Sequence, residues 1–205
     1  MKRILSILIA TISLIYATSL PSKSYTTITS VNKNRVTLQD EIGVNGQTAL
    51  VVRTLSTGDF ATAYIMQTSK NRAVLVDKDP TNGKHLANIK PALKEGDRVL
   101  GGFLYDKVMV IAPSKESFNE IQKKYSIHSL NPDLFLAFLK AKKVSRPNKK
   151  HYKEFAKMVG VGLFIIVTED YANVYDPISQ KVIAKSEYLN TDLSNIKPFY
   201  NTLED

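Results

Sequence analysis

The sequence of 205 residues contains no cysteine, no tryptophan and only three histidines. Without cysteine the chain cannot form a disulfide, a thiol nucleophile, an iron–sulfur cluster or a cysteine-based zinc site, and it cannot be acylated at a cysteine. The histidines, His85, His128 and His151, lie far apart and in polar surroundings. We therefore expect them at the surface or at helix caps rather than in a metal site.

Motifs for catalysis and cofactor binding are also missing. There is no Gly-x-Ser-x-Gly, no Walker-type phosphate loop and no His-Glu-x-x-His. Gly160-Val-Gly162 is not a dinucleotide fingerprint, because Ile165 takes the third glycine place and an apolar strand follows. The acidic segment that begins at Asp77 has Asn82 and Asn88 where an EF-hand loop needs glycine and glutamate.

These absences predict a protein that is not an enzyme and that holds no cofactor and no metal ion. One alternative is a hydrolase with an unrecognised carboxylate site. Its acids would come from the aspartates that stand at predicted turns, which are Asp59, Asp97, Asp170 and Asp176.

The N-terminus has the pattern of a secretory signal peptide. Lys2 and Arg3 precede an uncharged apolar run, and the small residues Ala17 and Ser19 suit the −3 and −1 positions of a cleavage site. We predict that residues 1–19 are the signal peptide and that the mature chain begins at Leu20. The two other interpretations are an uncleaved membrane anchor and a buried helix of a cytosolic protein.

A signal sequence in a chain without cysteine indicates an exported bacterial protein of the cell envelope, secreted into the periplasm or to the cell surface. The apolar run is about 17 residues long, near the lower limit for crossing a bilayer. No second apolar stretch approaches that length. No membrane span is therefore expected once the signal peptide has been removed.

Residues 20–112 are predicted to form a strand-rich lobe, either a small β-barrel or a sandwich. Period-two alternation and frequent turn residues run through it, with hairpin turns expected at Asn32-Lys-Asn34 and Ser69-Lys-Asn71. Asn45-Gly46 is a strong turn signal before the apolar strand that begins at Thr48. The fully apolar run 108–111 is expected to be the last strand of this lobe.

Residues 113–189 are predicted to form an α/β lobe packed on the first, which makes the fold class α+β. Helix starts are indicated at Ser114, at Asn131-Pro-Asp133 and at Asn148, and Gly160 suits a helix C-terminus. An apolar strand at 163–167 and a terminal hairpin around Asp176-Pro-Ile-Ser179 follow. Residues 190–205 are predicted to be a loose tail.

Positive charge is concentrated in one segment. The mature chain has 26 Lys and Arg against 19 Asp and Glu, a net charge of +7, whereas residues 140–157 alone carry eight cations and one acid, Glu154. The rest of the mature chain is therefore about neutral. The basic residues of the segment are Lys140, Lys142, Lys143, Arg146, Lys149, Lys150, Lys153 and Lys157.

A basic patch of this kind attracts lipopolysaccharide phosphates, glycosaminoglycans, nucleic acid or acidic proteins. The alternative is a solvated loop and helix face without a ligand. Nucleic acid is not an expected partner in vivo for an exported protein.

Four segments occur in a characteristic order and spacing. They are Leu50-Val-Val-Arg-Thr-Leu55, Lys94-Glu-Gly-Asp97 with Val108-Met-Val-Ile-Ala-Pro113, Asn131-Pro-Asp-Leu-Phe-Leu-Ala-Phe-Leu139, and Val159-Gly-Val-Gly-Leu-Phe-Ile-Ile-Val167. With them, the stretch from about Gln47 to Lys185 resembles the plasminogen-binding protein pgbA N-terminal domain family. The resemblance implies a bacterial envelope protein that recruits host plasminogen.

One departure from the family bears on that activity. Members such as the name-giving protein carry a long tail that ends in lysine, whereas this sequence ends in Glu204-Asp205. Plasminogen's lysine-binding modules favour a C-terminal lysine, whose ammonium and free carboxylate are both at one end of the chain, and two acids cannot mimic it. The basic patch offers internal lysines instead.

Two functions follow from the sequence. The first is a non-enzymatic envelope protein that binds host plasminogen, or an anionic envelope component or other polyanion, through the basic patch. The alternative is a periplasmic structural or assembly module that does not bind plasminogen.

Overall fold

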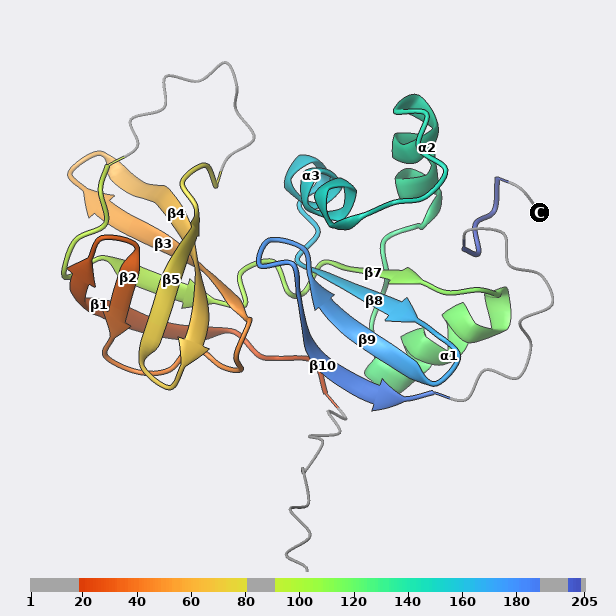
Figure 1. Cartoon of the computed structure of the whole chain (residues 1–205), viewed down its shortest axis with the longest axis horizontal. Helices are drawn as coiled ribbons and strands as arrows, with labels where there is room; N and C mark the ends of the chain where they lie inside the picture. Colours follow the sequence, from red (N-terminus) through yellow and green to blue (C-terminus); the bar gives the residue numbers. More distant parts are fainter. Residues whose placement is uncertain (1–18, 81–90, 189–198, 204–205) are drawn as a thin grey trace, which may run out of the picture.

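The computed structural model describes residues 19–80, 91–188 and 199–203. They form two lobes, a closed β-barrel and a four-stranded sheet flanked by helices (Figure 1). The α+β class expected from the sequence is confirmed, and the strand-rich half is a barrel rather than a sandwich.

The barrel closes in the strand order β1-β2-β5-β4-β3-β6 with every pair antiparallel. Its interior is a cluster of alternating apolar side chains that includes Ile28, Val51 and Ile65, as the period-two pattern requires. The predicted hairpins β1–β2 and β4–β5 are confirmed. The strands are β1 (Ser24–Asn32), β2 (Arg35–Leu38), β3 (Thr48–Leu55), β4 (Gly58–Ser69), β5 (Arg72–Asp77) and β6 (Arg98–Gly101).

The second sheet has the order β10-β9-β8-β7, in which β7 (Val108–Ile111) and β8 (Leu163–Val167) are parallel. The chain passes between them through three helices, α1 (Lys115–Tyr125), α2 (Asp133–Ala141) and α3 (Lys149–Val159). The predicted terminal hairpin is present as β9 (Tyr171–Asp176) and β10 (Lys181–Glu187).

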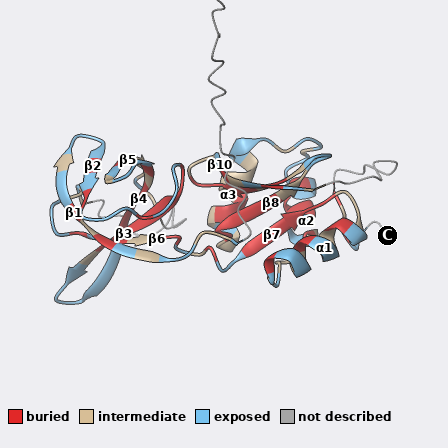
Figure 2. Ribbon diagram, turned by 90° about the horizontal axis from the view of Figure 1, so that it is seen from below, coloured by how far each residue is buried: buried red, intermediate tan, exposed pale blue. Residues whose placement is uncertain are grey.

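The position of β7 corrects the expected division of the chain. This strand was expected to complete the strand-rich lobe, but it pairs with β8 in the second sheet. All four of its residues are buried (Figure 2), and a continuous apolar run is typical of a parallel strand covered on both faces. The chain therefore passes from one lobe to the other between Gly101 and Val108, rather than near residue 112.

Helices cover both faces of the sheet. Val110 and Ile165 pack with Ile121 of α1 on one face, whereas Met109 and Phe164 pack with α2 and α3 on the other (Figure 1). The helix starts expected at Ser114 and Asn148 are confirmed, because each side chain accepts a hydrogen bond from an amide of the first turn.

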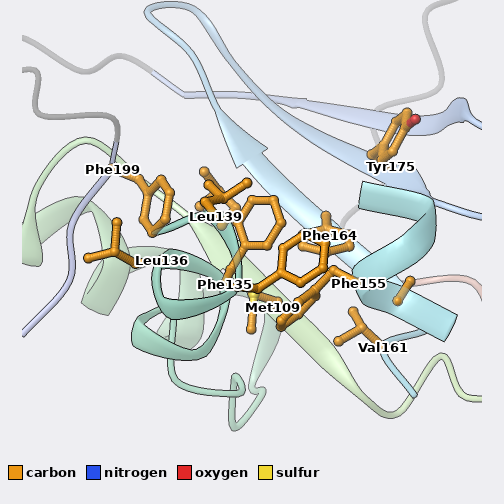
Figure 3. Packing of buried hydrophobic residues seen from close by; sticks show 12 residues of the cluster. Met109, Phe135, Leu136, Leu139, Phe155, Val161, Phe164, Tyr175 and Phe199 are labelled. Atoms are coloured by element: carbon orange, nitrogen blue, oxygen red, sulfur yellow. The ribbon is translucent and has the colours of Figure 1, made fainter. Parts of the chain in front are cut away.

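An aromatic cluster forms the core beneath α2 and α3 (Figure 3). The ring of Phe135 lies with its centre 5.0 Å from that of Phe155, 5.6 Å from that of Phe164 and 5.8 Å from that of Phe199. Phe199 is buried, and Thr202 donates its amide hydrogen to the carboxylate of Asp133. Residues 199–203, expected to belong to a loose tail, are therefore packed against α2; the rest of the predicted tail lies outside the described residues.

Two glycines mark tight points of the backbone between α3 and β8. Gly160 ends α3 with φ = 80°, a conformation that glycine adopts without strain. A Cβ at Gly162 would lie 2.1 Å from the carbonyl oxygen of Leu104. Gly160-Val-Gly162 thus lets α3 end and β8 begin directly beneath the connection between the lobes.

Within the described part of the chain, no helix is long and apolar enough to cross a membrane. The predicted signal peptide lies outside the described residues, apart from Ser19.

Candidate binding surface

The basic segment, residues 140–157, forms the end of α2, the loop after it and most of α3. The loop is held by hydrogen bonds at both ends. At its start, the amide of Lys143 donates to the carbonyl of Lys140 at 3.0 Å, and the amide of Val144 donates to that of Leu139 at 2.9 Å. This pair of bonds is a Schellman motif, in which Val144 packs against the aromatic cluster. Lys143 consequently has φ = 56°, in the left-handed region where glycine is favoured.

The far end of the loop is fixed by a capping box. The side chain of Asn148 accepts hydrogen bonds from the amides of Lys150 and His151, and Nδ1 of His151 accepts one from the amide of Asn148. His151 is thus a capping histidine, as its context predicted. The cap leaves the side chains of Lys149 and Lys150 exposed.

Glu154, the only acid of the segment, pairs with Lys142. Their charged atoms lie 2.5 Å apart, with 38% of the lysine and 42% of the glutamate side chain exposed. The hydrogen bond from Lys142 and the charges of Lys142 and Lys150 hold the pKa of Glu154 below its usual value. The Lys142 ammonium also lies 5.2 Å from the centre of the Phe138 ring.

Lys153 and Lys157 face the barrel instead of solvent. Both contact the carboxylate of Asp77 at the end of β5, at 2.9 and 3.4 Å. Partial burial raises the pKa of Asp77, but hydrogen bonds from Lys153 and from the Asp79 amide, together with both lysine charges, outweigh it and lower the pKa. These two lysines therefore join α3 to the barrel.

The structure thus divides the predicted basic patch. Two of its eight residues belong to the junction between the lobes, and six are exposed. We call these six the exposed basic surface: Lys140, Lys142, Lys143, Arg146, Lys149 and Lys150.

The role of Asp77 was missed in the sequence, where this residue was noted only as the start of a segment that does not fit an EF-hand loop. A signal was present on α3. Lys153 and Lys157 are four residues apart, so they share a helix face, and that face flanks the apolar stripe that includes Tyr152 and Phe155. Nothing in the sequence, however, identifies the carboxylate that they meet.

Three of the four aspartates considered for a carboxylate site are engaged with different partners, and Asp170 lies in the bend before β9. Asp59 pairs with Arg98, and Asp97 pairs with Arg53, both on the barrel. Asp176 is buried at the lobe junction and accepts hydrogen bonds from Thr48. In the part of the chain that the structure describes, there is also no group of three or more side chains able to hold a metal ion.

Comparison with known proteins gives one match. The family model described as plasminogen-binding protein pgbA N-terminal matches residues 23–205. The chain belongs to this family. The match extends beyond the stretch on which the resemblance rested and includes the first two barrel strands as well as residues 199–203. Neither the curated proteins nor the solved structures give a match.

Proposed function

We propose that this member of the pgbA N-terminal family is an exported, non-enzymatic protein of the bacterial envelope that binds host plasminogen through the exposed basic surface. The family description supports the ligand. The signal-peptide pattern supports export, and the absence of catalytic motifs supports a binding role.

The observation that carries the proposal is the pair formed by Lys142 and Glu154. A module that recognises lysine through both its ammonium and its carboxylate requires a neighbouring cation and anion that are free to meet the module's own acidic and basic groups. Lys142 and Glu154 supply one of each, and both are partly open to solvent, but they contact each other at 2.5 Å, so the pair has to open when the module binds. Glu154 is the only acid between residues 140 and 157. It is therefore the one residue of the segment that can take the place of the lysine carboxylate.

The test is binding of the mature chain, residues 20–205, to immobilised plasminogen with and without a free lysine analogue. We expect binding that the analogue abolishes. Lys142→Gln and Glu154→Gln should each weaken it about tenfold, the equivalent of about 1.4 kcal/mol. A matched pair on α1, Lys123→Gln and Glu116→Gln, also replaces an exposed cation and an exposed acid, and it should leave binding unchanged.

The opposite result has a clear meaning. If the mature chain does not bind plasminogen, or if the analogue has no effect, the proposal is wrong and the periplasmic structural or assembly role replaces it. Protease treatment of intact cells tests export to the surface separately, because only a surface-exposed protein would be cut.

A further inference from the structure

Four residues of the exposed basic surface lie in the loop after Lys142 and in the first turn of α3. Lys143, Arg146, Lys149 and Lys150 are exposed, and none of them makes an ion pair with any residue in the described part of the chain. They lie within eight residues of sequence. Because the loop between α2 and α3 is fixed at both ends, their backbone positions are defined without a ligand.

The surroundings of these cations favour an anionic partner. The first turn of α3 contains no acid, although acids are stabilised at a helix N-terminus by the helix dipole. Lys143 occupies a left-handed position that glycine would fill with less strain. In the first turn of α3 and at position 143, the chain therefore has lysines where an acid or a glycine would stabilise the backbone better. These lysines raise the positive potential of the surface.

The form of the surface indicates what kind of anion it takes. The side chain of Asn148 already occupies the amides of Lys150 and His151, so a single phosphate cannot use them as a binding nest. The anion is instead contacted by the separate, flexible ammonium and guanidinium groups of the side chains. Such groups suit a polymer that presents many anions in succession, because each cation can meet a different one.

Two classes of polyanion are disfavoured by the residue types of the loop. Residues 142–150 contain no aromatic side chain, so single-stranded nucleic acid finds no ring on which a base could stack. The one apolar branched side chain, Val144, packs against the aromatic cluster and is not available to insert into a membrane. A sulfated polysaccharide requires neither feature.

We propose that Lys143, Arg146, Lys149 and Lys150 form a binding surface for a sulfated polysaccharide, in addition to the plasminogen binding proposed above. The interaction is electrostatic, so its affinity falls steeply with salt. With four cations engaged, the logarithm of the binding constant should fall by about three to four for each tenfold rise in salt concentration.

The experiment measures binding of the mature chain to heparin, the probe for this class, over a series of NaCl concentrations. In the test variant all four residues are replaced by glutamine. Its matched control loses the same charge at four exposed lysines elsewhere: Lys33→Gln, Lys70→Gln, Lys115→Gln and Lys123→Gln.

We expect the test variant to lose at least about tenfold in affinity and most of its salt dependence, and the control to change by less than about twofold. Equal losses in both variants would show that only net charge matters and would overturn the site. Unchanged binding of the test variant would also overturn it. Equally tight binding to vesicles rich in anionic lipid would overturn the assignment to a polysaccharide in favour of a membrane surface.

Glu154→Gln separates this proposal from the plasminogen proposal. Removing that acid takes a negative charge from the surface and releases Lys142, so heparin binding should stay the same or strengthen. Plasminogen binding should weaken in the same variant. Heparin binding that weakens would contradict the polyanion surface, whatever the outcome with plasminogen.

Discussion

Asp176 at the end of β9 accepts hydrogen bonds from both the amide and the hydroxyl of Thr48, the first residue of β3 in the barrel, at 3.0 and 2.7 Å. The same carboxylate oxygen accepts a bond from the hydroxyl of Tyr105, and the other oxygen accepts the amides of Ile178 and Ser179. Asp176 is completely buried. One carboxylate therefore holds the barrel, the connection between the lobes and the β9–β10 turn together.

Replacing Asp176 tests this junction. Asp176→Asn puts an amide donor where the carboxylate faces donors from Thr48 and Tyr105, which leaves buried groups unpaired. We expect the variant to lose about 3 kcal/mol of unfolding free energy, since each unsatisfied buried group costs about 1–3 kcal/mol. Urea unfolding measures the loss. Asp106→Asn, whose aspartate side chain is 60% exposed, is the control and should change stability by less than about 0.5 kcal/mol.

Asp77 makes another polar contact between the lobes, and it should make the free energy of unfolding depend on pH. Its pKa is lower in the folded chain than in the unfolded chain, so its contribution is present above the unfolded pKa and is lost as the pH falls through the folded pKa. Asp77→Asn should therefore destabilise the protein at neutral pH, and the difference from the wild type should shrink in acid. Unfolding curves recorded at several pH values give the free energy of unfolding of the wild type and of the variant, and hence their difference at each pH. A difference that does not change with pH would mean that the lysine contacts contribute nothing.

Phe199 should stabilise the α/β lobe although it comes after the last strand. It is buried in the aromatic cluster next to Phe135, so Phe199→Ala leaves a cavity and should cost about 3 kcal/mol. Leu203 is 60% exposed, and Leu203→Ala should have little effect. Thermal unfolding of the two variants compares them directly. Equal and small effects would mean that this segment is not part of the core.

The elements whose signals are local could be predicted from the sequence. The cap at Asn148, the C-terminal Gly160 and the hairpin at Lys70 depend on neighbouring residues, and the structure confirms all three. The placement of β7 could not be predicted, because an apolar run of four residues fits either lobe until its pairing partner is known. The pairing of β7 with β8, which is distant in the sequence, decides which lobe β7 joins, and the local residue pattern contains no information about that pairing.

The same limit explains the outcome for the candidate surface. The concentration of positive charge in residues 140–157 is a property of the sequence. Which of these residues face solvent depends on how α3 lies against the barrel. Asp77 is separated from Lys157 by 80 positions, so nothing near the basic segment indicates that two of its lysines are engaged.

Lys143 allows charge and backbone strain to be separated at a single position. A non-glycine residue in the left-handed region costs about 1–2 kcal/mol, and glycine recovers part of this while adding entropy to the unfolded chain. Lys143→Gly should therefore raise the unfolding free energy by about 0.5–1 kcal/mol while it weakens heparin binding. Lys142, with φ = −90°, is the control position, and Lys142→Gly should not stabilise. Urea unfolding and heparin binding of both variants decide the matter. A stabilised Lys143→Gly that binds heparin as tightly as the wild type would mean that this lysine serves neither the fold nor the surface.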